Sequence, residues 1–455
     1  MYPSTRLALR QRLDRVVAAF GLGGDRIVAV LGALLLITYL AAAIAFPKSS
    51  GQIVVGDAKG HYVQLRSLVF DRDLDFRNEY LALASSSMRI EDWPTWDLTA
   101  TAHVRNYMPV GPALLWLPVY VIVVLVDWLL ALIGLGAIPH GYERSLQLVP
   151  GAVGVLATTV AAQLTWRMAA RFTSRAMAVI GAVTVWLGSH ALYYSLVSPA
   201  YSHAASMLTA ALFFWYWLNP GIPFSVKRAA WLGALAGVCA LMRWQDALLF
   251  VAPVVECLRW RVAWRLRSTA LAVAGAAWLV AFAPQMAVWN VLYGQPFALP
   301  QGGSFMQWTQ PHLKDVLVSS ARGLFVWAPL LVPAMLGVAS FAMRRPKWRW
   351  ALLAILVATW YVNAAVADWW AGEAFGARRF LSLTPLFGLG LAVWMADRFW
   401  RIAAAGALVA ANILLLLQYQ LALKGFEAIA PYPTGFVDMW LARFVVPLRL
   451  VGWGG

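Results

Sequence analysis

Long apolar runs recur along this sequence from Ile27 onward, and they constrain the fold more than any other feature. Several approach the roughly 20 residues that an α-helix needs to cross a hydrocarbon core about 30 Å thick. Inside a bilayer every backbone polar group needs a partner within the protein, which favours helices. With 62% hydrophobic and only 12% charged residues, the chain also lacks the polar surface of a soluble protein. We therefore predict an all-α polytopic membrane protein.

The apolar runs predict about 11 transmembrane helices. Two of them form a short helical hairpin within residues 229–258. The other crossings are expected at residues 27–46, 148–166, 177–194, 203–218, 269–289, 323–341, 351–366, 381–395 and 402–421.

The net charge of +16 does not predict nucleic-acid binding, because the basic residues cluster in short loops between apolar runs. Lys and Arg are enriched in cytoplasmic loops of membrane proteins. The clusters within 167–175, 259–267 and 344–349 therefore predict cytoplasmic loops, and the N-terminus is expected on the same side. All six histidines and most acidic residues then fall outside. We expect a bacterial inner (plasma) membrane protein whose site faces the periplasm.

The apolar segment 112–138 decides this topology. A single crossing here would turn the later basic clusters outward, so we expect a re-entrant or interfacial helix pair, with Asp127 near its turn. The predicted organisation is a cytoplasmic N-terminus at 1–26, a transmembrane domain at 27–421 and an outer-side tail at 422–455. The first outer loop, 47–147, is the longest region that does not cross.

Asp57, Lys59, His61 and Tyr62 follow directly after the first apolar run. A carboxylate near the end of a membrane span can act as a general base toward an acceptor hydroxyl. The other interpretation of Asp57 is a helix N-cap, a position that aspartate favours.

An acidic run further along this loop offers oxygen ligands for a hard cation. It contains Asp71, Asp73 and Asp75. The run lacks the glycine-bearing twelve-residue loop of a calcium site, and a solvated, structured loop is the alternative interpretation.

The short hairpin carries Arg243 and Asp246 near its tip. Each arm would reach roughly 22 Å, less than the hydrocarbon core, so both residues are expected at lipid-headgroup depth. Charged residues at that depth are costly and mark functional sites. A local Arg243–Asp246 ion pair that stabilises the turn is the alternative.

Two adjacent arginines on the predicted outer side, Arg378 and Arg379, run against the charge rule. One guanidinium group can donate two parallel hydrogen bonds to two oxygens of the same phosphate. Arg378 and Arg379 therefore favour a phosphate site. Salt bridges to Asp368 or Glu373 are the alternative. Tyr201 and His203 are expected at the same outer level. The predicted substrate pocket consists of His61, Tyr62, Asp246, Tyr201, His203 and Glu373.

The layout resembles the GT-C superfamily of membrane glycosyltransferases. The hairpin sequence L-A-G-V-C-A-L-M-R-W-Q-D-A-L-L-F-V-A-P is similar to a G-x-x-x-G-L-A-x-L-x-R-x-x-A-x-L-x-x-P stretch of its protein mannosyltransferase and lipid A aminoarabinose transferase branches. The resemblance assigns Asp57 as base or acceptor-orienting residue and Arg243, Arg378, Arg379 and Lys59 as donor-phosphate ligands. One departure is that Asp57-Ala58 stands where the family has Asp-Glu.

The resemblance implies an inverting transfer of a sugar from a polyprenyl-phosphate donor to an outer-face glycan, lipid or protein acceptor. Arginines would stabilise the charge that develops on the leaving phosphate. No cofactor is expected, and the partners are the donor, the acceptor and membrane lipids. A transporter or lipid flippase is one alternative, although we see no internal repeat. A glycan ligase or polymerase with a diphosphate-linked donor is the other.

Overall fold

The computed structural model of this chain describes residues 23–46, 51–83, 97–372, 374–396, 398, 400–423, 441 and 448. Within these residues the secondary structure is helical, apart from two isolated β-bridges. Five of the described helices are long and apolar enough to cross a membrane, and a bent pair can supply a sixth crossing. The predicted class, an all-α protein with several membrane spans, is confirmed, while the number of about 11 spans stays a prediction.

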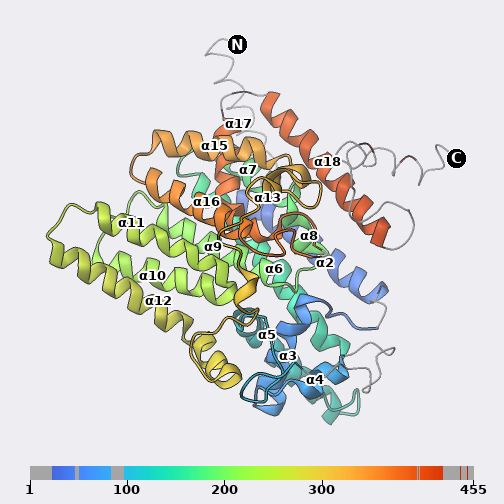
Figure 1. The fold of residues 1–455 in the computed structure, drawn as a ribbon. Coiled ribbons are helices and arrows are strands. Elements are labelled where there is room, and N and C mark those ends of the chain that lie inside the picture. Colours follow the sequence, from blue (N-terminus) through green and yellow to red (C-terminus); the bar gives the residue numbers. More distant parts are fainter. Residues whose placement is uncertain are drawn as a thin grey trace.

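Figure 1 labels the helices in chain order. The main bundle contains α2 (Gly24–Ala45), α6 (Arg144–Ala169), α7 (Arg175–Leu187), α8 (His190–Leu196), α9 (Ser202–Trp217), α15 (Leu331–Arg344), α16 (Arg349–Ala364), α17 (Thr384–Met395) and α18 (Trp400–Leu423). The hairpin and its neighbour are α10 (Val226–Met242), η3 (Trp244–Phe250), α11 (Val251–Arg259) and α12 (Trp264–Tyr293). The first loop holds α3 (Asp57–Arg66), η1 (Ser67–Asp71), α4 (Arg77–Ala82) and α5 (Gly111–Leu132). The short elements are η4 (Gly303–Phe305), α13 (Asp315–Val318), α14 (Leu324–Trp327) and η5 (Arg378–Leu383).

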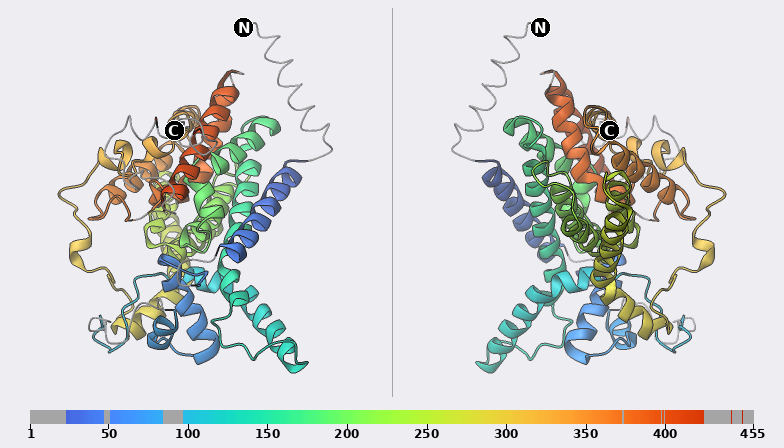
Figure 2. Two further views of the ribbon diagram at one scale, coloured as in Figure 1. Left: turned by 90° about the vertical axis from the view of Figure 1, so that its right-hand side faces the viewer. Right: turned by 90° about the vertical axis from the view of Figure 1, so that its left-hand side faces the viewer.

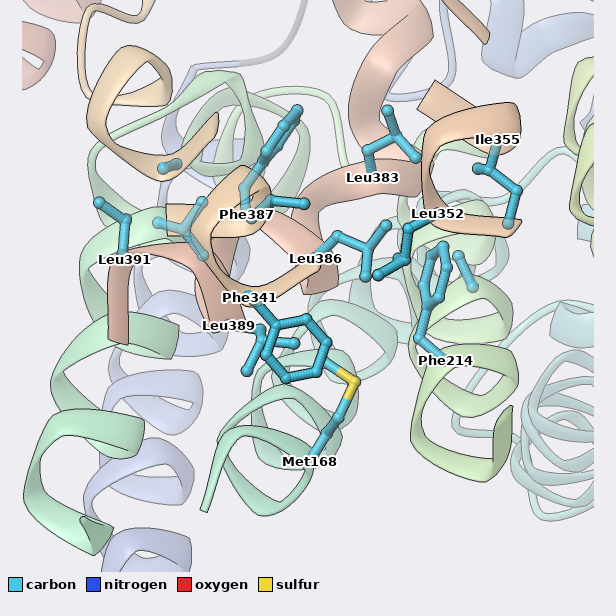
Figure 3. Close-up of a cluster of buried hydrophobic side chains, with 14 of the residues drawn as sticks. Met168, Phe214, Phe341, Leu352, Ile355, Leu383, Leu386, Phe387, Leu389 and Leu391 are labelled. Carbon is cyan, nitrogen blue, oxygen red and sulfur yellow. The ribbon is translucent and has the colours of Figure 1, made fainter. Parts of the chain in front are cut away.

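Glycines let α15, α17 and α7 approach one another closely. A Cβ added at Gly337 of α15 would lie 1.9 Å from the carbonyl oxygen of Gly390 in α17. A Cβ at Gly181 of α7 would lie 2.7 Å from the carbonyl oxygen of Gly388. Small residues allow this contact between helices in lipid, where association rests on packing. Large apolar side chains fill the adjoining space (Figure 3), among them Met168, Phe214, Phe341, Leu352 and Leu386.

The hairpin ends beneath the first loop. Its first arm, α10, has 17 residues and so spans about 25 Å, less than the hydrocarbon core, as predicted. At its C-terminal end, a Cβ added at Gly111 would lie 2.3 Å from the carbonyl oxygen of Leu241. The start of α5 therefore rests on the hairpin tip, and Arg243 follows directly under the loop.

The expected helix pair in segment 112–138 is wrong, because Gly111–Leu132 forms one continuous helix, α5. Asp127 lies inside this helix and accepts a hydrogen bond from Ser145 Oγ at 2.7 Å. A single aspartate does not break a run of helix-forming apolar residues. From Ile122 onward, large apolar side chains of α5 are exposed, and this end of the helix extends away from the other helices (Figure 2).

Two crossings predicted as continuous helices are interrupted. The segment 177–194 bends by 72° between α7 and α8. Ser189 lies at the bend, and its hydroxyl caps α8 by accepting from the Ala191 N–H at 3.2 Å. The segment 323–341 is divided between α14 and α15, with Pro329 in the gap. Proline has no N–H and disfavours a helical conformation of the residue before it, which separates the two helices.

Candidate active site

Asp57 is the first residue of α3, and its carboxylate leaves the helix to meet Arg378. Arg378 Nη1 donates to Asp57 Oδ2 at 2.5 Å. The N-cap is Gly56, without a side-chain cap, so the interpretation of Asp57 as an N-cap is wrong. Gly56 has φ +59°, and an added Cβ would lie 2.3 Å from the Tyr201 hydroxyl oxygen. This close approach turns the start of α3 toward Arg378. The Asp57 side chain remains about a third exposed (35%).

The two adjacent arginines take different partners because they lie in a 3-10 turn, η5, where consecutive side chains diverge. Arg379 donates to the Asp368 carboxylate and to the Asp368 backbone carbonyl, both at 2.7 Å. The predicted alternative, a salt bridge to Asp368, is therefore present for Arg379. Burial lowers the pKa of Arg379. Burial also opposes the charge on Arg378, but Tyr194 and Asp57 outweigh it, and the pKa of Arg378 is raised. Both guanidinium groups are charged.

Arg243 ends α10 in an extended conformation and is 6% exposed. Its Nη1 is buried without a hydrogen-bond partner among the described residues. The nearby Asp246 accepts from Ser206 Oγ at 2.5 Å, and the described residues include no Arg243–Asp246 ion pair within 4.0 Å. The alternative of a local pair at the turn is therefore wrong. Arg243 lies within electrostatic range of both Arg378 and Arg379.

Aromatic side chains lie beside these arginines. The Arg378 guanidinium lies over the Tyr201 ring, 5.9 Å from its centroid. The rings of His203 and Tyr194 are 4.6 Å apart, and His203 is within electrostatic range of Arg243, Arg378 and Arg379. Nδ1 of the buried His203 has no hydrogen-bond partner in the described part of the chain. Tyr201 and His203, both predicted, thus lie with the arginines.

His61 lies in α3, four residues after Asp57. Its Nδ1 lies 2.9 Å from the Pro109 carbonyl oxygen, and because a carbonyl only accepts, Nδ1 carries the proton. Burial lowers the pKa of His61 to about 4, so the ring is neutral near pH 7. Nε2 is then an acceptor, buried and unpartnered among the described residues. His61 is within electrostatic range of Asp57 and Arg243.

Lys59 and Tyr62, two predicted site residues of the first loop, have partners away from Asp57 and the arginines. Lys59 Nζ donates to the Leu83 carbonyl at 2.7 Å, so it ties α3 to the end of α4. The Tyr62 hydroxyl donates to the Gly141 carbonyl at 2.7 Å inside an apolar cluster. Helical spacing explains the difference, because neither residue shares the face of α3 that presents Asp57 and His61, four positions apart.

The acidic run does not gather into a metal site. Asp71 contacts Arg66 and accepts from Asn78 at 2.7 Å, whereas Asp73 accepts from Ser67 Oγ at 2.8 Å. Asp75 faces Arg77 at 3.5 Å. Across the described residues, no group of three or more His, Cys, Asp or Glu side chains could hold a metal ion. The candidate metal ligands are therefore corrected to structural partners. Glu373 lies outside the described residues.

Three contributing residues were not predicted. Ser206 lies one turn after His203 on α9 and holds Asp246, and the i,i+3 spacing in the sequence could have indicated it. Tyr194 follows the bend between α7 and α8, which no residue pattern announced. Arg322 donates to the Ala374 carbonyl at 2.5 Å and so anchors the loop before η5.

An apolar groove lies between the hairpin tip and α12. It has a volume of about 310 Å³, and Trp244, Trp278, Phe282, Trp289 and Phe297 line it. Trp244 directly follows Arg243 in the sequence, so one wall of the groove belongs to the hairpin tip. An amphiphile would match these features, its anionic head the arginines and its apolar chain the groove.

Comparisons with known proteins gave structural matches only. No protein-family model and no curated protein sequence matches the chain. Over 93% of its length, the chain is similar to the crystal structure of ArnT from Cupriavidus metallidurans bound to undecaprenyl phosphate, with 18% identity, 72% of that chain covered and a TM-score of 0.46. The apo structure of the same protein matches 93% of this chain and 73% of its own, with 16% identity and a TM-score of 0.49. Identities this low do not transfer residue roles.

Proposed function

We propose that this chain is a membrane glycosyltransferase that moves a sugar from a polyprenyl-phosphate donor to an acceptor on the outer face of the membrane. The observation that carries the proposal is the Asp57–Arg378 ion pair, with Arg243 and Arg379 within electrostatic range. The carboxylate supplies a base, and guanidinium groups match phosphate oxygens. Arg243 supports the donor role further, because its buried Nη1 has no partner among the described residues.

The reaction uses these groups in one inverting displacement. The acceptor hydroxyl attacks the anomeric carbon while Asp57 takes its proton. A new carbon–oxygen bond forms to the acceptor, the bond to the donor phosphate breaks, and polyprenyl phosphate leaves with the electron pair. The arginines stabilise the charge that grows on the phosphate, so their effect is largest in the transition state. No step requires an oxidant or a nucleotide.

Donor binding is expected to release the base. Arg378 Nη1 donates to Asp57 Oδ2 at 2.5 Å, so the carboxylate is engaged by the guanidinium group. A donor phosphate would compete with Asp57 for Arg378 and free the carboxylate to contact the acceptor hydroxyl. The reaction is therefore ordered, with the donor first and the acceptor second.

The groove at the hairpin tip supports the lipid character of the donor. Its aromatic lining and volume of about 310 Å³ suit a section of prenyl chain, and apolar burial favours such a chain over a water-soluble nucleotide sugar. Arg243 would hold the phosphate at the mouth of the groove while Trp244 contacts the first isoprene units.

The decisive experiment measures donor binding and sugar transfer with purified full-length protein. A panel of polyprenyl-phosphate sugars is offered, with membrane extract as acceptor, to the wild type and to Arg378→Ala. We expect at least one donor to bind and react, and the substitution to weaken binding by about 10- to 100-fold through the loss of a charged hydrogen bond.

Arg344→Ala is the matched control, because Arg344 is an exposed arginine at the far end of α15. It should bind and transfer like the wild type. If a folded protein binds none of the donors, the proposal is wrong. Transfer from diphosphate-linked glycans but not from monophosphate sugars would replace it with the ligase or polymerase alternative.

A further inference from the structure

A second cavity lies at the N-terminal end of α12, and the proposed reaction does not use it. Its volume is about 350 Å³, and Cys257, Leu258, Trp264, Arg267 and Leu271 contribute to its lining. The C-terminal end of α11 and the first turns of α12 form its walls. Figure 1 shows this end of α12 beside α11, at the end of the hairpin that lies away from α3. We call it the α11–α12 crevice.

The α11–α12 crevice lies at the opposite end of a long helix from the candidate active site. The other end of α12 reaches the first loop, where the Tyr293 hydroxyl donates to the Asn106 carbonyl at 2.8 Å. From Arg267 to Tyr293 the helix rises roughly 40 Å, about the thickness of a bilayer with its headgroups. The crevice is thus a separate site, at the end of α12 where the basic cluster predicts the cytoplasmic surface, and an inference about it does not depend on the proposed function.

One arginine lines the crevice and three more lie close in sequence to the residues that line it. Arg259, Arg261 and Arg265 are exposed, and Arg267 is half-buried. Among the described residues, no carboxylate forms an ion pair with any of the four. The neighbouring Glu256 is turned inward, where it accepts from Trp217 Nε1 at 2.7 Å. The positive charge at this surface is therefore uncompensated.

Arg267 directs part of this charge into the crevice. Its guanidinium lies over the Trp264 ring, 5.8 Å from the centroid, and its Nη1 makes only a 3.4 Å contact with the Leu258 carbonyl. Nε of Arg267 is buried and has no hydrogen-bond partner within the described ranges. A guanidinium held this way retains donors for an anion that enters the crevice.

Apolar side chains next to these arginines are exposed as well. Trp264 is 69% and Leu258 61% exposed. Most of α12 faces outward, with only 22% of its most apolar window buried inside the protein. Acyl chains of the surrounding bilayer can therefore reach the crevice from the side. Basic residues above an apolar, tryptophan-bearing wall match a phospholipid with a negatively charged head.

We propose that the α11–α12 crevice binds an anionic phospholipid. Its phosphate contacts Arg267 and the surrounding arginines, and one acyl chain lies against Trp264, Leu258 and Leu271. The lipid would fix the α11–α12 turn at the membrane surface, and so support the hairpin whose other end carries Arg243.

Native mass spectrometry of the delipidated full-length protein tests this proposal. Phosphatidylglycerol and phosphatidylcholine are titrated separately, and the occupancy of the first bound lipid is measured. The wild type should prefer phosphatidylglycerol. Arg267→Gln should raise the dissociation constant for phosphatidylglycerol about fivefold, the effect of one basic residue near an anionic lipid surface. Phosphatidylcholine binding should stay unchanged.

Two further variants separate the crevice from general surface charge. Trp264→Ala should weaken both lipids, because it removes the apolar wall, and at 69% exposure its loss should leave the fold intact. Arg344→Gln removes an exposed arginine at another helix end and should change neither lipid. Equal binding of the two lipids by the wild type would overturn the proposal. So would equal effects of Arg267→Gln and Arg344→Gln, or displacement of the lipid by millimolar inorganic phosphate.

Discussion

The packed centre of the bundle and the candidate active site use opposite means of bringing helices together. In the centre, α15, α17 and α7 meet through glycines, and large apolar side chains fill what remains (Figure 3). At the site, the end of one helix meets the start of another through charged and aromatic groups, as between Asp57 and Arg378. The centre leaves no room for change, whereas the site keeps polar atoms without partners among the described residues.

This difference separates what holds the fold from what binds a ligand. Close backbone contact tolerates no added volume, because an intruding atom meets a carbonyl rather than a flexible side chain. The buried donors and acceptors of Arg243, His61 and His203 are unfavourable for folding unless a ligand satisfies them. Substitutions in the centre should therefore change stability, and substitutions at the site should change function with stability preserved.

The largest effect is expected from Gly337→Val in the bundle centre. Its Cβ would lie 1.9 Å from the Gly390 carbonyl oxygen, so α15 and α17 would have to separate, at more than about 3 kcal/mol. Size-exclusion chromatography should show little folded protein. Gly275→Val on α12 is the control, because an added Cβ there meets nothing within 4 Å. A Gly337→Val protein with the wild-type melting temperature would show that the bundle centre does tolerate added volume.

Asp57→Asn should be the most damaging change at the site. Loss of the general base should lower kcat by about 10²- to 10⁴-fold, with the melting temperature preserved. Arg378 would lose its carboxylate partner, so the affinity for the donor should stay the same or rise. Steady-state kinetics and equilibrium donor binding measure the two effects separately. Full activity would remove Asp57 as the base, and weakened donor binding would contradict its competition with the phosphate.

Arg243→Gln should have an intermediate effect. Glutamine keeps a donor at the hairpin tip but removes the charge, so the KM for the donor should rise about tenfold or more, the value of one charged hydrogen bond. The KM for the acceptor should change little. Arg228→Gln would be a poor control because Arg228 is almost fully buried, so Arg344→Gln serves instead. Unchanged donor KM would remove Arg243 from the phosphate site.

The smallest effect concerns pH and a buried carboxyl of the first loop. Glu79 is 0% exposed and accepts from Arg66 at 3.0 Å, and burial raises its pKa to about 7. Because the folded pKa exceeds the ordinary value, this group favours the folded state at low pH. That contribution is lost as the pH rises toward 7. Glu79→Gln should therefore reduce the fall in melting temperature between pH 5 and pH 8 by about 2 °C.

His61 provides the check on this result. Burial lowers the pKa of His61 to about 4, so its contribution has the opposite sign and is lost as the pH falls from about 6.5 toward 4. Both proteins contain His61, so its contribution to the pH dependence of stability cancels when Glu79→Gln is compared with the wild type. An unchanged pH dependence in Glu79→Gln would show that Glu79 is already ionised in the folded protein.

The sequence by itself determined the class of the protein and most of its helices. An unbroken apolar run of about 20 residues favours a helix, because a helix satisfies all backbone hydrogen bonds within the one segment. The same reasoning placed α2, α6, α9, α12 and α18 close to their observed bounds. It also singled out Arg243, because charge at headgroup depth is costly, and the Arg378–Arg379 pair, because outer arginines run against the charge rule. Asp57 was singled out as a carboxylate close to the end of the first span.

Only the tertiary structure decided how these residues combine. Asp57 and Arg378 are 321 positions apart, and no local pattern could pair them. Lys59 and Tyr62 satisfied the same sequence criteria as Asp57, yet the packing of α3 against α4 and α5 gave them other partners. The sequence of segment 112–138 did not distinguish two helices joined by a turn from the one continuous helix, α5, that forms there. Local composition determines where a chain is helical, whereas the contacts between distant helix ends determine which polar groups share a site.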